Sequence, residues 1–255
     1  MPDTTSASPA TPVRLGSRGG RNSERYVYAA LAAVFVVLVF SGFARTYYLK
    51  FLFAGPPLPS PLVQVHGLVM TAWVGLFLVQ VGLVSARRVR VHQRLGYAGI
   101  GLAVLLIVTG VWTALAAARH GSASTPVGFS QPTFSIVPLG DILLFAVFFG
   151  GAVHFRRTPA RHKMLMFLTA VNFLPPAVSR LPIELVQANP VPFGLGIPVG
   201  LALAGLAFDT WRHWRVDRVL VAAVLLLIVS FPGRIALMAT PAWARTAAWL
   251  ATLVN

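Results

Sequence analysis

The chain has 255 residues but no cysteine, only six acidic residues and only two lysines, Lys50 and Lys163. Without thiols it cannot form disulfides, ligate an iron–sulfur cluster through cysteine, attach c-type haem covalently or use a thiolate nucleophile. The lysine of a retinal Schiff base would have to stand in the last apolar segment, and none does. Serine-hydrolase, phosphate-loop and His-Glu-x-x-His motifs are also missing, so we assign no catalytic residue and favour a non-enzymatic role.

Apolar residues are what the chain has in excess. They make up 56% of the sequence, against 11% charged residues, and the mean hydropathy is +0.75. Soluble domains carry roughly a quarter of charged residues, so the composition predicts that most of this chain lies in a lipid bilayer. The net charge of +15 comes from basic residues between apolar segments. Such residues set membrane topology, and we therefore expect no nucleic-acid partner.

Seven apolar segments are long enough to cross a membrane, which takes about 20 residues at about 1.5 Å each. The sequence therefore predicts an all-α, polytopic membrane bundle of about seven transmembrane helices. The expected spans cover residues 26–44, 62–86, 95–118, 137–155, 163–181, 194–211 and 218–240.

Basic residues concentrate on one side of these spans. Because Lys and Arg are retained in the cytoplasm, this bias predicts an inner-membrane protein of a bacterium with its N-terminus inside and its C-terminus outside. Fifteen of the 21 Lys and Arg residues belong to the expected inner side: Arg14, Arg18, Arg21, Arg25, Arg87, Arg88, Arg90, Arg94, Arg156, Arg157, Arg161, Lys163, Arg212, Arg215 and Arg218.

The chain divides into three parts. Residues 1–25 are rich in Ser, Thr, Pro, Gly and Arg, a composition that predicts a disordered basic cytoplasmic tail. Residues 26–240 form the transmembrane domain. After Pro241, Trp243, Ala247 and Leu250 recur at helical spacing, so residues 241–255 are expected to form a short outer interfacial helix or a frayed tail.

Four ionisable residues lie toward the outer end of their spans: His66, Asp141, Arg180 and Arg234. An isolated charged Asp141 would cost several kcal/mol in lipid, so its expected partner is Arg180 or Arg234. Asn172 lies nearer the middle of the fifth span, before Pro175-Pro176. Two readings stay open for this group: an ion pair that holds the bundle together, or an outward-facing pocket for a small ligand, a lipid or a partner subunit.

Histidines suggest a second class of function, a membrane redox protein with haem b, which needs two imidazoles at one depth. His66 with His120 is a possible outer pair, and His92 with His154 or His162 a possible inner one. A divalent metal bound by His66, Asp141 and His120 is a weaker variant of this hypothesis. A transporter is the third possibility, because Pro and Gly interrupt the fifth and seventh spans.

The two inner loops before the third and fifth spans are alike, since His92 and His162 each stand three residues before a leucine. This repeated pattern indicates a duplicated helical hairpin. It is compatible with a paired imidazole site, but also with arginines that simply reach the lipid headgroups while the histidines face water.

A set of short motifs is spread between residues about 45 and 250: Pro56-Pro57-Leu58-Pro59, His66-Gly67, Trp73, Gln80, residues 90–96, residues 162–166, Pro176, Arg180 and Thr240-Pro241-Ala242-Trp243. Together they resemble a family of bacterial multi-pass, seven-helix membrane proteins to which no activity is attached. The basic loop ending in His-x-x-Leu is more distantly similar to small membrane proteins linked to haem–copper oxidase assembly.

Overall fold

The computed structural model describes residues 18–53, 60–121 and 130–254, and all regular structure in these ranges is helical. Residues 1–17 of the expected tail lie outside the described residues. The first helix, α1 (Arg18–Phe43), begins within the segment expected to be a tail and continues into a short π-helical turn, η1 (Ala44–Tyr48).

Six helical segments of the described chain are long and apolar enough to cross a membrane, so the protein is a multi-pass membrane protein. The first is Tyr26–Tyr48, formed by most of α1 together with η1. The others are α2 (Pro61–Ser85), α3 (Val89–His120), α4 (Gln131–Phe134) with α5 (Ile136–His154), α9 (Pro190–His213) and α10 (Arg218–Met238).

The segment expected as a continuous fifth span, residues 163–181, is broken. It consists of α6 (Pro159–Val171) and the single turn α7 (Pro175–Val178), followed by α8 (Glu184–Ala188). Pro175 and Pro176 have no backbone N–H, so the helix cannot continue its hydrogen bonds through them. With 13 residues, α6 alone is too short to cross a bilayer.

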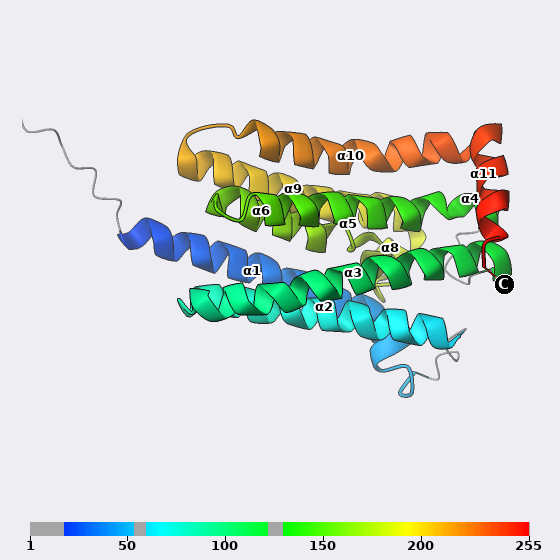
Figure 1. Ribbon diagram of the computed structural model, residues 1–255, viewed down its shortest axis with the longest axis horizontal. Coiled ribbons are helices and arrows are strands. Elements are labelled where there is room, and N and C mark those ends of the chain that lie inside the picture. The colour runs from blue at the N-terminus through cyan, green and yellow to red at the C-terminus, as the bar shows by residue number, and fades with distance from the viewer. Residues whose placement is uncertain (1–17, 54–59, 122–129, 255) are drawn as a thin grey trace, which may run out of the picture.

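The basic segments lie at one end of the bundle. Figure 1 shows α1 beginning at the same end as the α2–α3, α5–α6 and α9–α10 turns, while the C-terminus lies at the opposite end. The residues after Pro241 form α11 (Pro241–Ala251), which runs across that opposite end. Trp243 Nε1 donates a hydrogen bond of 2.8 Å to the carbonyl oxygen of Thr133, and this bond fixes α11 to α4.

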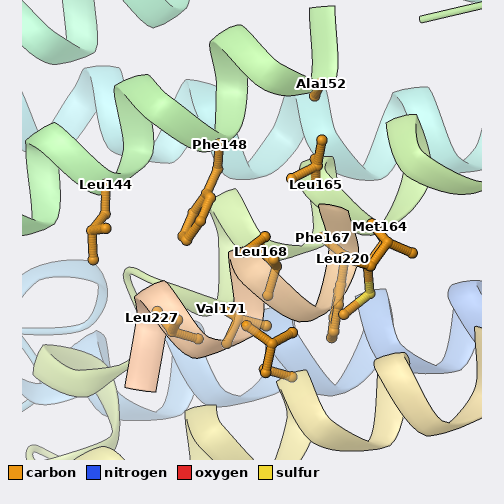
Figure 2. Close-up of a cluster of buried hydrophobic side chains, with 13 residues drawn as sticks. Leu144, Phe148, Ala152, Met164, Leu165, Phe167, Leu168, Val171, Leu220 and Leu227 are labelled. Atoms are coloured by element: carbon orange, nitrogen blue, oxygen red, sulfur yellow. The ribbon is translucent and has the colours of Figure 1, made fainter. Parts of the chain in front are cut away.

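The short helix α6 is the most enclosed element of the core. It packs against α1, α5, α9 and α10, and Figure 2 shows Leu168 of α6 among side chains from α5 and α10. The following turn, α7, approaches α1 so closely that a Cβ atom on Gly42 would overlap the carbonyl oxygen of Ala177. Thr169 of α6 and Asn172, which follows it, are buried and therefore have to find partners inside the protein.

Candidate functional site

Asp141 of α5 and Arg234 of α10 form an ion pair inside the bundle. Arg234 Nη1 lies 2.6 Å from Asp141 Oδ1, and the two side chains are only 11% and 16% exposed. Of the two partners expected for Asp141, the structure places Arg234 against it. A charge-assisted hydrogen bond of this length is among the stronger interactions available to a buried carboxylate.

The rest of the Arg234 side chain is held by backbone carbonyls. Its Nη1 also donates to the carbonyl oxygen of Val137 at 2.6 Å, and its Nε donates to that of Ser230 at 3.2 Å. Gly140 makes this approach possible, because a Cβ atom there would overlap the Cδ atom of Arg234. These contacts agree with the first hypothesis from the sequence, in which the ion pair holds the bundle together, here by joining α10 to α5.

Asn172, which lies at the break between α6 and α7, is hydrogen-bonded to α5 at Asp141, the residue that pairs with Arg234. Its Nδ2 donates to the carbonyl oxygen of Asp141 at 2.7 Å, and the residue is 2% exposed. Its Oδ1 is buried and has no hydrogen-bond partner in the described part of the chain. Its backbone carbonyl cannot receive a helical hydrogen bond either, because the donors three and four residues later would be Pro175 and Pro176.

His66 and Arg180 contact other neighbours. The Thr109 hydroxyl donates to the carbonyl oxygen of Leu105 at 2.8 Å, so the 3.3 Å contact between His66 Nδ1 and Thr109 Oγ1 requires the imidazole to donate. In the neutral imidazole, Nε2 of His66 is then the acceptor. Arg180 donates from Nη1 to the carbonyl oxygen of Pro176 at 2.5 Å and lies over the Phe43 ring, against α1.

Among the histidine pairs expected from the sequence, His92 and His162 are the pair whose rings meet. Their ring centres are 6.1 Å apart and their planes are nearly perpendicular, at 80°. His154 is exposed and its ring contacts Phe155, while His120 is exposed at the end of α3. The inner pairing of His92 with His162 is therefore the one that the fold assembles.

The two rings differ in what their nitrogens contact. His162 Nδ1 lies 2.8 Å from the carbonyl oxygen of Ala152, which can only accept, so Nδ1 carries a proton, and in the neutral imidazole Nε2 is the nitrogen with the lone pair. His92 Nδ1 is buried and has no hydrogen-bond partner within the described ranges. One imidazole is thus oriented by a carbonyl, and the other has an unsatisfied buried nitrogen.

No group of three or more His, Cys, Asp or Glu side chains able to hold a metal ion occurs in residues 18–53, 60–121 and 130–254. The expected site of His66, Asp141 and His120 is therefore not assembled. Sequence reasoning also missed two acids at the basic end. Asp209 is buried and pairs with His213 at 3.2 Å, and Asp217 pairs with Arg161 at 2.8 Å.

Asp217 could have been found from its position directly before Arg218, the first residue of α10. Its carboxylate accepts from the backbone N–H of Val219 at 2.9 Å, as a helix N-cap does. Burial alone would raise the pKa of Asp217, but the hydrogen bonds from Arg161 and Val219 outweigh it and hold the pKa below its usual value.

The chain matches no family model, no curated protein and no solved structure.

Removing one member of the Asp141–Arg234 pair should destabilise the protein strongly. Asp141→Asn leaves the buried guanidinium without its anion, and such losses cost about 3–5 kcal/mol. Arg234→Met should cost a similar amount, whereas the double variant Asp141→Asn/Arg234→Met should recover much of the loss. Thermal unfolding in detergent measures the three variants, and strictly additive effects would show that the two side chains are not coupled.

The depressed pKa of Asp217 predicts a loss of stability in acid. Because the folded carboxyl has a lower pKa than the unfolded one, its contribution is complete above about pH 4 and disappears as the pH falls through the folded pKa. The unfolding temperature of the wild type should therefore exceed that of Asp217→Asn at pH 7, and the two should converge toward pH 3. A difference that does not change with pH would contradict this explanation.

Proposed function

We propose that this protein is a bacterial inner-membrane protein that binds a transition-metal centre between His92 and His162. The observation that carries the proposal is the meeting of two imidazoles from α3 and α6, 70 positions apart in the chain, at 6.1 Å between ring centres. Two ring nitrogens bound at about 2 Å on nearly opposite sides of one ion would separate the ring centres by about 6 Å.

The topology that accompanies this proposal has seven crossings, with α6 and α7 together forming a broken fifth one. An odd number of crossings agrees with termini at opposite ends of the bundle (Figure 1). Placing the basic turns in the cytoplasm follows the retention of Lys and Arg on that side. The metal site would then lie near the inner surface of the membrane.

The hydrogen bonds of the pair support a metal role. Histidines that ligate metals usually donate their second N–H to a carbonyl or carboxylate, which fixes the ring and leaves the other nitrogen free. His162 has this arrangement through the carbonyl oxygen of Ala152. A bound metal would also satisfy the buried Nδ1 of His92.

The charges nearby limit which metal fits. The pair lies in the first turns of α3 and α6, within two basic segments of the chain. Arg88, Arg90 and Arg94 are close to His92 in the sequence, and Arg161 and Lys163 are adjacent to His162. A divalent ion with no anionic ligand would be repelled by these charges, whereas haem iron, with its porphyrin and carboxylates, or a single Cu(I) ion would be repelled much less. We therefore propose haem b iron or copper as the bound centre.

Metal analysis and an absorbance spectrum of the purified full-length protein test this function. We expect about one haem or one copper per chain at this site, lost in His92→Ala and in His162→Ala because each removes a ligand. His154→Ala is the matched control, since His154 is exposed at the same end of the bundle, and it should retain the metal. A metal-free wild type, or metal retained by both ligand variants, would refute the proposal.

Ligand binding in the outer half is a second candidate, favoured by the unsatisfied Oδ1 of Asn172. This atom and the Asn172 carbonyl are two acceptors beside the Asp141–Arg234 pair, and they suit a small molecule or lipid headgroup with O–H or N–H donors.

To test this, small molecules that copurify with the wild type and with Asn172→Leu can be compared by mass spectrometry. At least one species should be lost from Asn172→Leu but kept by Asn189→Leu, which alters an exposed asparagine bonded to Leu185. If all three preparations contain the same set of molecules, Asn172 has only a structural role at the break between α6 and α7.

A further inference from the structure

We infer that an anionic phospholipid binds through its phosphate group to an arginine cluster at the basic end of the bundle, between the α5–α6 turn and the α9–α10 turn. This site is independent of the metal proposed for His92 and His162. The arginine cluster consists of Arg156, Arg157, Arg212, Arg215 and Arg218.

One ion pair brings the two turns together. Arg161 Nε donates to Asp217 Oδ2 at 2.8 Å, which joins the first turn of α6 to the residue before α10. The Arg161 guanidinium also lies 5.0 Å from the centre of the Phe155 ring, so it is held on two sides. The arginines of the α5–α6 turn directly follow Phe155, and those of the α9–α10 turn stand on either side of Asp217. The pair therefore places both sets of arginines in one region of the surface.

Arg212 lies at the same level. A Cβ atom on Gly205 of α9 would lie 3.0 Å from the sulfur of Met164 of α6, so these two residues face each other. Arg212 follows Gly205 by seven residues, or about two turns, and so lies on nearly the same face of α9. Because α6 and α9 are antiparallel (Figure 1), this position is level with the α5–α6 turn. The Nε atom of Arg212 is buried and has no hydrogen-bond partner in the described part of the chain.

The charge of the cluster is not neutralised by the described protein. Residues 155–161 and 212–218 contain six arginines but a single acid, Asp217, which is bonded to Arg161. Among the described residues, none of the five cluster arginines has a hydrogen-bond or ion-pair partner. Four of them are exposed, and Arg212 is half-buried. Like charges held close together repel one another, so an anion that reaches this surface is attracted to it.

Two exposed tryptophans indicate the depth of the cluster in the membrane. Trp211 is 62% exposed in the last turn of α9, and Trp214, the residue that ends α9, is 86% exposed. Exposed tryptophans of membrane proteins gather at the level of the lipid headgroups. Arg212 lies between these two residues in the chain, and Arg215 follows them. The cluster therefore lies at the depth where phospholipids carry their phosphate groups.

The chemistry of arginine selects the ligand. The guanidinium presents its N–H donors in a planar fork that matches the oxygens of a phosphate group. A zwitterionic headgroup carries its own ammonium beside the phosphate, which offsets the attraction, whereas an anionic phospholipid brings a net negative charge. Basic clusters between the ends of membrane helices bind anionic headgroups in this way. Phosphatidylglycerol has the required charge, and its acyl chains remain in the bilayer beside α6 and α9.

The test is native mass spectrometry of the delipidated full-length protein in detergent, titrated with phosphatidylglycerol or with phosphatidylcholine. We expect one phosphatidylglycerol per chain at concentrations where phosphatidylcholine does not bind. Arg215→Gln/Arg218→Gln should weaken this binding about thirtyfold, as expected for two charges near an anionic headgroup. Arg90→Gln/Arg94→Gln is the matched control, because it removes two exposed arginines from the same end of the bundle, and it should keep the wild-type affinity.

Three results would overturn the inference. Equal binding of the two lipids by the wild type, a comparison that needs no variant, would show that charge does not select the ligand. An equal loss in the control variant would show that only the total charge of this end matters. Complete displacement of phosphatidylglycerol by excess inorganic phosphate would identify the occupant as a soluble phosphate compound, because a lipid is also held by its acyl chains.

Discussion

A buried carboxylate in a membrane protein has to be neutralised by a partner inside the bundle, and the bond between Asp141 and Arg234 meets that constraint here. The pair determines more than the contact of two helices. Arg234 also uses the carbonyl oxygen of Val137, so α10 is tied to α5 at two successive turns. Asn172 donates to the carbonyl oxygen of Asp141 itself, which brings the broken helix to the same level. Three elements distant in sequence are thereby fixed at one depth.

The helix α5 holds α6 at both of its ends. Near the outer end, the carbonyl oxygen of Asp141 accepts from Asn172, and near the basic end that of Ala152 accepts from His162. These acceptors are 11 positions apart on α5, and the donors, His162 of α6 and the Asn172 that caps it, are 10 positions apart. The two intervals correspond to about 16.5 Å and about 15 Å of helix. The two antiparallel helices therefore match in length, and the position of the His162 ring beside His92 follows from the same alignment that places Asn172 beside Asp141.

The spans and the basic end of the bundle could be predicted because hydropathy and charge are local properties of the sequence. The partner of Asp141 could be narrowed to two arginines but not chosen, since the choice depends on how α10 and α7 pack. Pro175-Pro176 signalled an interruption, yet the hydropathy of residues 163–181 suggested one continuous span. The repeated His-x-x-Leu spacing pointed to His92 and His162. The sequence could not decide whether His154 or His162 meets His92. That choice depends on the packing of α3, α5 and α6, which leaves His154 on the exposed end of α5.

The Asp141–Arg234 pair and the His92–His162 pair differ in how completely their polar atoms are satisfied. Arg234 donates to a carboxylate and to two carbonyls, so a ligand there would have to replace strong bonds that already exist. At the basic end, a buried nitrogen of His92 has no hydrogen-bond partner among the described residues, and such an unpaired group costs a folded protein about 1–3 kcal/mol. A metal that binds this nitrogen removes the cost, and because it binds only the folded state it also stabilises that state. In the function that we propose, the ion pair is therefore the fixed part of the structure, and the imidazole pair is the part that binds the metal.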